Sequence, residues 1–298
     1  MPNGSLSYAL VTPARNEAAN LPRLADSLAS QTIAPVRWIV VDNGSTDDTA
    51  EVARKLASRA PVRVLTVAGE RQPTRGGPVA RAFMAGLAGL DLEPDVLVKM
   101  DADVSLDADY FERLLDEFAA DPRLGMAGGT CYELEDGEWL PRHVTAGSVR
   151  GAARAYRWAC LQDVLPLEAR TGWDGIDELK AAAHGWRTTS FTHLRFYHHR
   201  LLGHRDHRPR RQPFELGESA YWSGYRPSYL VLSAVFRARR HPTALAMIAG
   251  YASAALRRAP RCPDPAVRAH VRRQQRLGTL PERVREALGK RPPVAPSA

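Results

Sequence analysis

The sequence predicts an α/β fold with a mostly parallel sheet flanked by helices, followed by a basic helical C-terminal extension. Short apolar runs alternate with helical patterns over the first 130 residues. This alternation is typical of βαβ units. The runs are almost continuously apolar, which indicates strands that are covered on both faces. The expected strands are residues 8–11, 38–41, 62–67 and 96–100.

Apolar residues recur at helical spacing after each of these four strands. Asn20 can cap the first helix, and Ser45 or Thr46 the second. The expected helices cover residues 20–28, 45–57, 78–90 and 110–118. In sheets of this kind, ligands bind beyond the carboxyl ends of the strands, where the loops converge. We therefore look for function in those loops.

Composition excludes several protein classes. The chain has 298 residues, of which 44% are apolar and 25% charged, so it is globular rather than disordered. Three cysteines in a chain of this length exclude a disulfide scaffold and indicate a reducing compartment. The first residues do not have the pattern of a secretory signal. We expect a cytoplasmic protein.

Charge is distributed unevenly along the chain. Residues 201–298 contain 19 Lys and Arg against 6 Asp and Glu, whereas the whole chain has a net charge of +8. Residues 1–200 therefore have a net charge of −5. We expect a catalytic domain at residues 1–205 and a basic, partly apolar region at 206–298. Such a basic region favours anionic partners.

The basic region contains two apolar segments, residues 229–232 and 243–256. The longer one would make a helix of about 21 Å, which is shorter than the roughly 30 Å core of a bilayer. It should not span a membrane. Two interpretations stay open: helices that pack on the catalytic domain, or arginine-flanked helices on the inner membrane surface. Nucleic acid is not expected as a partner.

Polar residues gather after three of the expected strands, at positions 12–17, 42–48 and 101–103. Asp101 and Asp103 form an Asp-x-Asp motif after a buried strand. Carboxylate oxygens are preferred ligands of Mg²⁺ and Mn²⁺, which bridge carboxylates to a substrate diphosphate. The structural alternatives are that Asp103 caps the next turn and that Asp42 belongs to a helix-capping turn.

Two common phosphate-binding motifs are absent from the sequence. Residues 13–17 read Pro-Ala-Arg-Asn-Glu, so no Gly-x-Gly-x-x-Gly follows the first strand. The Gly-x-x-x-x-Gly-Lys-Ser/Thr loop is also missing. A dinucleotide-dependent dehydrogenase is therefore disfavoured, and any bound phosphates must be held by a metal ion and by Arg or Lys.

Taken in order, residues 11–17, 39–47 and 99–103 resemble the inverting family 2 glycosyltransferases of GT-A fold, and the resemblance extends over residues 6–205. It implies that a metal ion, Mn²⁺ or Mg²⁺, is bound by Asp101 and Asp103. Asp101 could instead meet the ribose. Family members more often have two acids before the glycine, where this chain has Asp42 and Asn43. The residues implied in nucleotide binding are Thr12, Pro13, Arg15, Glu17, Asp42, Asp101 and Arg75, with Arg71 competing for the role of Arg75.

The resemblance also implies a catalytic acid before a helix that ends in Gly-aromatic-Arg. Counting back from residues 185–187 assigns this acid to Asp174, with Trp173 in place of the family's glutamate. Asp177 is the rival. Either carboxylate could instead serve as a helix N-cap.

Further basic residues follow the last core strand or precede the expected catalytic acid. The resemblance implies that His198 binds the metal ion, and that His199 or Arg200 contacts the diphosphate or the acceptor; the alternative is a basic loop. Residues 149–158 have helical spacing, with arginines at 150, 154 and 157. These arginines could bind an anionic acceptor or form a solvated helix face. The Cys and His spacing does not form a zinc motif.

The resemblance therefore implies an inverting, metal-dependent transfer of a sugar from a nucleotide donor, expected to be a UDP-sugar. The acceptor could be a carbohydrate, a lipid-linked compound or a small molecule. A nucleotidyltransferase is the first alternative, but residues 13–17 lack the glycine-rich basic loop that would grip a triphosphate. The second alternative is a catalytically silent protein that binds a sugar nucleotide or lipid.

Overall fold

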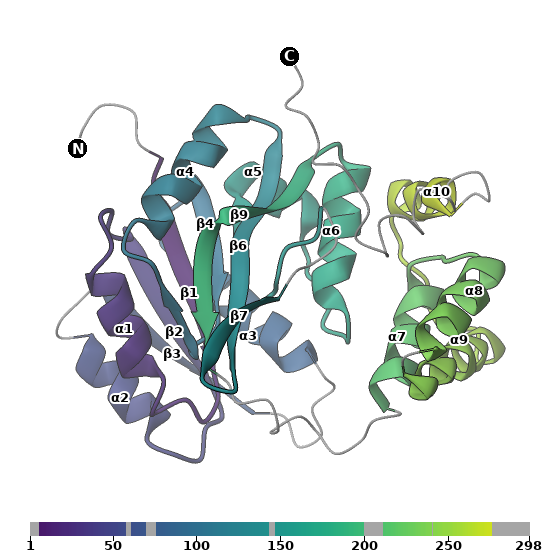
Figure 1. Ribbon diagram of the computed structural model, residues 1–298, viewed down its shortest axis with the longest axis horizontal. Coiled ribbons are helices and arrows are strands. Elements are labelled where there is room, and N and C mark those ends of the chain that lie inside the picture. Colours follow the sequence, from purple (N-terminus) through teal and green to yellow (C-terminus); the bar gives the residue numbers. More distant parts are fainter. Residues whose placement is uncertain are drawn as a thin grey trace. The chain divides into compact units, whose positions relative to one another are not determined.

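The computed structural model describes residues 6–57, 61–69, 76–142, 147–199, 211–239 and 241–275 (Figure 1). The chain divides into two units. The first comprises residues 1–144 and 148–207, and the second comprises residues 145–147 and 208–298. Within the described residues, the first unit contains the sheet and the second is helical.

A nine-stranded sheet forms the centre of the first unit. Its order is β3-β2-β1-β4-β8-β6-β9-β5, and β7 pairs with β6 outside this path. Four strands pair in parallel: β1 (Tyr8–Ala14), β2 (Arg37–Asn43), β3 (Val62–Val67) and β4 (Val96–Met100). The others are β5 (Val104–Leu106), β6 (Leu124–Glu135), β7 (Glu138–Arg142), β8 (Ala153–Arg157) and β9 (Arg187–His198). Among these, only β6 and β9 pair in parallel, and β8 runs antiparallel to both β4 and β6. The predicted α/β class is confirmed, with parallel pairing concentrated in the first half.

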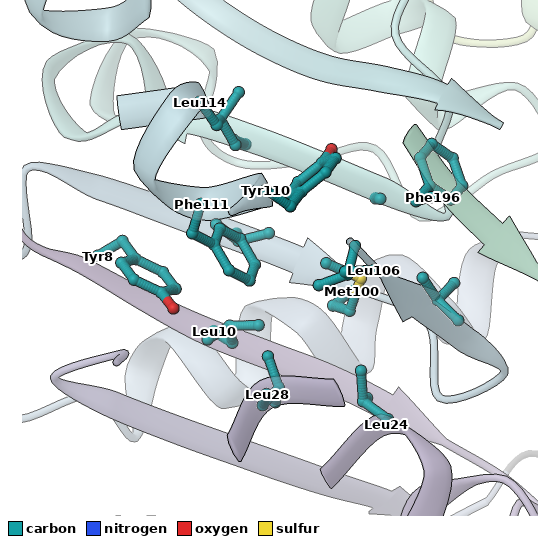
Figure 2. Packing of buried hydrophobic residues seen from close by; sticks show 14 of the residues in the cluster. Tyr8, Leu10, Leu24, Leu28, Met100, Leu106, Tyr110, Phe111, Leu114 and Phe196 are labelled. Carbon is teal, nitrogen blue, oxygen red and sulfur yellow. The ribbon is translucent and has the colours of Figure 1, made fainter. Parts of the chain in front are cut away.

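One face of the sheet is covered by α1 (Leu21–Ala29), α2 (Thr49–Leu56) and α4 (Tyr110–Ala120). Figure 2 shows Leu24 and Leu28 of α1 and Phe111 of α4 meeting the buried side of β1. The ring of Tyr8 stacks on Phe111 with 4.3 Å between centroids. Burial of such aromatic and aliphatic side chains is the main favourable contribution to folding.

The other face is covered by α3 (Gly77–Ala88), α5 (Trp158–Val164) and α6 (Trp173–Ala183). Helix α3 lies very close to the sheet at Gly86. A Cβ atom at this position would be 2.3 Å from a methyl carbon of Val11 and 3.0 Å from one of Val41. Only glycine allows this approach, which fixes α3 against β1 and β2.

The helix predicted over residues 149–158 is wrong. Residues 153–157 form β8, with Ala155 opposite Val98 of β4 and opposite Ala127 of β6. Buried alanines alternate with arginines along this strand, and pairing on both edges outweighs the local helical spacing. The edge of β4 would otherwise leave its backbone groups without partners.

The second unit contains α7 (Arg211–Trp222), α8 (Pro227–Ala238), the short 3₁₀ helix η1 (Pro242–Leu245), α9 (Ala246–Leu256) and α10 (Pro265–Gln274). Helices α7 and α9 pack with their backbones in contact. A Cβ atom on Gly250 would be 1.9 Å from the carbonyl oxygen of Phe214, and one on Gly217 would be 2.0 Å from that of Met247. The two apolar segments of the sequence thus form helices. Among the described residues, no helix combines the length and apolar character needed to cross a membrane.

Candidate active site

The loops after β1 and β2 are joined by hydrogen bonds at the carboxyl edge of the sheet. Asn16 adopts a left-handed backbone conformation with φ of 56°. Its main-chain N–H donates to the Ser45 hydroxyl at 3.0 Å, and its side-chain oxygen accepts from the Thr46 N–H at 2.8 Å. Asp42 is buried at the end of β2 and accepts from the Ser45 N–H at 3.1 Å. Two of the three polar clusters therefore form one rigid edge.

The residues expected near the nucleotide occupy different environments at this edge. Thr12 is fully buried, and its hydroxyl accepts a 3.0 Å hydrogen bond from the indole of Trp38. Glu17 is buried and accepts from the Asn20 side chain at 2.7 Å. Pro13 is half-buried and Arg15 is exposed. The role of these residues in nucleotide binding stays a prediction. Arg71, Arg75 and Arg200 lie outside the described residues.

Three predicted metal ligands come together at the end of β4. Asp101 and Asp103 follow β4, and His198 ends β9, where it pairs in register with Val104 of β5. One ligand atom from each of Asp101, Asp103 and His198 lies within 4.8 Å of the other two. Two carboxylates and one imidazole suit Mn²⁺ or Mg²⁺, because these ions favour oxygen ligands and Mn²⁺ also accepts nitrogen. The residues present therefore fit a divalent cation.

His198 lies between two carboxylates. Its Nε2 atom is 3.4 Å from Asp103, and its Nδ1 atom is 3.7 Å from Glu133. Burial lowers the pKa of His198, but the surrounding carboxylates outweigh burial and raise the pKa above its ordinary value. A second group of possible ligands contains Cys131, Glu133 and His198. Burial raises the pKa of Cys131 to about 11, so this thiol stays neutral and is a poor ligand.

Lys99 connects Asp101 to a neighbouring backbone segment. Its side chain is almost completely buried, and its ammonium group donates to Asp101 and, at 2.6 Å, to the carbonyl of Gly151. The Asp101 N–H donates to the carbonyl of Ala152 at 2.8 Å. Residues 151–152 are therefore held directly beside Asp101.

Asp174 lies beside the same segment. It lies in the first turn of α6, after Gly172, whose φ of 79° only glycine adopts readily. Its side chain accepts from the Gly175 N–H at 3.1 Å. A Cβ atom on Gly151 would be 3.4 Å from Oδ2 of Asp174. Asp101 and Asp174 thus flank one short backbone segment, and the carboxylate of Asp174 is only half-buried.

Asp177 has a different environment. Its side chain is 2% exposed, accepts a hydrogen bond from the Tyr156 hydroxyl, and lies 3.1 Å from the guanidinium of Arg154. Burial raises the pKa of Asp177 to about 7, although Arg154 and Tyr156 oppose this effect. The carboxylate is enclosed by protein groups, so an acceptor hydroxyl cannot reach it without rearrangement of these partners.

His199 is engaged by its own neighbours. Its Nε2 atom is 2.7 Å from the Ser105 hydroxyl, and its ring lies edge-on to Trp139 with 5.1 Å between centroids. Burial lowers the pKa of His199, so the ring favours its neutral form. The expectation that it contacts the diphosphate or acceptor stays a prediction.

Two of the arginines expected to bind an acceptor have structural contacts instead. Arg154 is 1% exposed and donates to the carbonyls of Val149 and Asp174. Arg157 donates to main-chain carbonyls, among them that of Leu124 at 2.9 Å. Arg154 therefore neither faces an acceptor nor belongs to a solvated helix face, and both expectations are wrong for this residue. For Arg157, the contacts with main-chain carbonyls do not support a role in acceptor binding.

Sequence reasoning missed the buried partners of the site, Lys99, Glu133 and the ion pair of Arg154 with Asp177. One signal was available for Lys99, because it is the single charge in the apolar run of residues 96–100. A buried lysine requires a partner, so this charge predicts a nearby carboxylate.

Comparisons with known proteins identify the family and the fold. The model of Glycosyl transferase family 2 matches residues 9–165. Succinoglycan biosynthesis protein ExoA of Rhizobium meliloti (strain 1021) is 36% identical over 117 residues, which cover 39% of this chain and 34% of ExoA. The chain thus spans about a third of the length of this relative.

Solved structures share the fold. A mannosyltransferase from Pyrobaculum calidifontis, in complex with GDP-Man and Mn²⁺, aligns with a TM-score of 0.60 and 17% identity over 96% of this chain and 85% of that chain. GalNAc-T7 with UDP, GalNAc and Mn²⁺ also has a TM-score of 0.60, with 14% identity over 84% of this chain and 55% of that chain. At these identities the likeness shows the GT-A fold. The family match extends over more than half of the sequence, and the chain belongs to glycosyl transferase family 2.

Proposed function

We propose that this protein transfers a sugar from a nucleoside diphosphate donor to an acceptor hydroxyl, with inversion at the anomeric carbon. The observation that carries the proposal is that Asp101 and Asp174 both lie against residues 151–152. In a member of this family, this supports Asp101 as a cation ligand and the half-buried Asp174 as a base in the same site. Residues 1–205 would perform the transfer.

Asp101, Asp103 and His198 would hold a divalent cation, Mn²⁺ or Mg²⁺. When bound, such an ion neutralises the charge that develops on the leaving diphosphate and acts as a Lewis acid. The solved mannosyltransferase and GalNAc-T7 both contain Mn²⁺ together with a nucleotide or nucleotide sugar. This supports the same class of ion for the present chain.

Asp174 would be the general base. Its half-buried carboxylate accepts from the Gly175 N–H and lies beside Gly151, so one oxygen can reach a hydroxyl group. Asp177 is the weaker candidate, because its carboxylate is buried against Tyr156 and Arg154. We therefore assign Asp177 a positioning role: through Arg154, it would hold the first turn of α6, which carries Asp174.

The proposed reaction is a single displacement. The acceptor oxygen forms a bond to the anomeric carbon, and the bond between that carbon and the diphosphate oxygen breaks. The bonding electrons leave with the nucleoside diphosphate, and the acceptor proton moves to the carboxylate of Asp174. Attack opposite the leaving group inverts the anomeric configuration, so no second nucleophilic carboxylate is needed.

The donor would be a UDP-sugar, with GDP- and dTDP-sugars as alternatives, since the structural relatives include both a GDP-mannose and a UDP complex. A carbohydrate, a lipid-linked compound or a small molecule could be the acceptor. Donor choice can be tested before the acceptor is known, because many transferases slowly hydrolyse their donor. A panel of UDP-, GDP- and dTDP-sugars should give release of one nucleoside diphosphate, only with Mn²⁺ or Mg²⁺ present.

The test of mechanism compares Asp174→Asn with Asp177→Asn on the donor so identified. A positioned base typically contributes about 10² to 10⁴ in rate, so Asp174→Asn should lose this factor in turnover while its donor Kd stays unchanged. Asp177→Asn should retain most of its turnover. An unimpaired Asp174→Asn enzyme would transfer the role to Asp177, and a wild-type protein that binds donor without release under any metal condition would be a binding protein.

A further inference from the structure

Helix α8 in the second unit presents an apolar face to solvent. Its buried positions are Leu230 and Ala234, one turn apart. The opposite side has four large apolar side chains whose exposed fractions lie between 38% and 49%: Val231, Leu232, Val235 and Phe236. These positions are spaced i, i+1, i+4 and i+5, so they lie on one side of the helix. An ordinary surface helix has polar residues there.

The short helix η1 packs against α8, and its Leu245 is a further large apolar side chain that is 48% exposed. We call Val231, Leu232, Val235, Phe236 and Leu245 the α8 patch. Contiguous exposed apolar surfaces of this kind mark interaction sites in soluble proteins.

Basic side chains lie at both ends of α8. Arg226 precedes the helix, Arg237 lies in its last turn, Arg239 and His241 follow it, and all four are exposed. The guanidinium carbon of Arg239 lies 5.6 Å from the ring centroid of Phe236, so the charge is held directly over an aromatic member of the patch. Residues 211–275 contain eleven arginines, no lysine and three acidic residues.

A groove opens at the same end of α8. It has a volume of about 640 Å³ and is lined by side chains of α7, α8, η1 and α9 together with Arg239 and His241. The apolar lining includes Leu216, Phe236 and Met247. A lining that combines apolar side chains with guanidinium groups suits a ligand that has an acyl chain and an anionic head.

We propose that the α8 patch docks this protein on the surface of an anionic lipid bilayer. The apolar side chains would enter the boundary between headgroups and acyl chains, and the arginines would contact lipid phosphates. At 12 residues, α8 is about 18 Å long, so it would lie in the plane of the surface.

Charge favours the bilayer over a second copy of this chain. A two-fold dimer formed through the patch would bring two identical arginine borders together, and like charges across an interface disfavour association. An anionic lipid surface complements both the apolar face and its border. The surface is also independent of the sugar-transfer chemistry, so it can be tested without a donor or an acceptor.

The test is co-flotation of the full chain with vesicles of phosphatidylcholine, with and without phosphatidylglycerol. Wild-type protein should float only with the anionic vesicles. Raising the ionic strength from about 0.1 M to about 1 M should weaken binding, because the Debye length falls from about 10 Å to 3 Å. The variant L232S/V235S/F236S should bind at least about tenfold more weakly. These three side chains are exposed, so the variant should melt at the wild-type temperature.

Two further variants complete the design. L134S/L140S makes the same chemical change at two exposed leucines of the first unit and should bind like wild type. R237Q/R239Q should lose most of the salt dependence. The proposal is overturned if wild type fails to bind anionic vesicles, or if the triple variant binds as wild type does. It is also overturned if the triple variant only converts a dimer to a monomer or only lowers the melting temperature, since the patch would then be covered by protein.

Discussion

The guanidinium of Arg154 on β8 donates a 2.6 Å hydrogen bond to the main-chain carbonyl of Asp174 in the first turn of α6. The same group lies 3.1 Å from the Asp177 carboxylate and 2.7 Å from that of Glu178. Strand β8 pairs directly with β4, and Asp101 follows β4, so the neighbour of that strand also supports the turn that carries the proposed base. The relative position of the two carboxylates is therefore set by the sheet.

Replacing Arg154 with methionine should destabilise the protein strongly. Arg154 pairs with the Glu178 carboxylate and donates to the Asp174 carbonyl, and both acceptors would lose this donor. Removal of one partner from such a buried pair typically costs about 3–5 kcal/mol. Arg187→Met is the matched control, because Arg187 pairs with Asp121 at 2.6 Å on the surface, where such pairs contribute about 1 kcal/mol or less. Urea unfolding measures both variants. Equal losses of unfolding free energy in the two variants would show that the buried pair of Arg154 stabilises the protein no more than a surface pair does.

Asp177 should make stability depend on pH. Its pKa is raised by burial from 3.8 to about 7, so the folded state binds more protons than the unfolded state within this interval. Stability should therefore fall as pH rises from about 4 to about 7 and then level off. Asp177→Asn should remove this slope, so the advantage of wild type over the variant should be larger at about pH 5 than at about pH 8.

Asp121→Asn is the control for this pH dependence. Burial raises the pKa of Asp121, but the hydrogen bonds and positive charges of Arg187 and Arg123 together outweigh burial and lower the pKa. Asp121 therefore titrates below its ordinary range, and its contribution is lost only under more acidic conditions. The difference between wild type and Asp121→Asn should be the same at both pH values. A similar slope for both variants would contradict the assignment to Asp177.

Cation binding should depend on Asp103 and His198. Asp103→Asn and His198→Gln should each weaken Mn²⁺ binding in the presence of nucleoside diphosphate by at least about tenfold, measured by calorimetry or by electron paramagnetic resonance. His193→Gln serves as the control, because His193 lies on the same strand but pairs with Glu117 at 3.2 Å near the surface. Unchanged Mn²⁺ affinity in both test variants would place the ion elsewhere.

Thr12 should matter for stability through Trp38. Thr12→Val leaves the buried indole N–H without its acceptor, which should cost about 1–3 kcal/mol. Thr12→Ser keeps a hydroxyl group and should lose much less. Both variants should bind the donor like wild type if the Thr12 side chain serves only Trp38. A raised donor Kd in Thr12→Val alone would instead support a direct contact with the nucleotide.

The local pattern of apolar and turn residues was sufficient to predict the strands in the first half of the fold. The strands at residues 62–67 and 96–100 have the bounds expected from the sequence, because each is flanked by turn residues. Strand β4 is buried along its whole length, as its apolar run predicts, whereas β3 is partly exposed. The second half was not predictable in this way. Strand β8 contains the buried Arg154 and the half-buried Arg157. From sequence alone, arginines at this spacing are typical of a solvated helix face. The strand becomes evident only from its pairing with β4 and β6.

The candidate site shows the same division. Asp42, Asp101 and Asp103 could be predicted because each follows an apolar strand, and parallel strands end at one edge. The pairing of His198 with Glu133 depends on the register between β9 and β6, which are more than 50 residues apart in the chain. Asp174 and Asp177 are three residues apart on one helix, and only burial distinguishes the accessible carboxylate from the enclosed one.

Lys99 has a consequence for attempts to redesign what this enzyme accepts. Its ammonium group holds Asp101 and the Gly151 carbonyl at once, so the backbone at residue 151 is attached to a proposed cation ligand. Substitutions that rotate this carbonyl would release the lysine and disturb Asp101. Libraries for altered selectivity should therefore vary side chains around this residue while keeping the backbone at position 151 as it is.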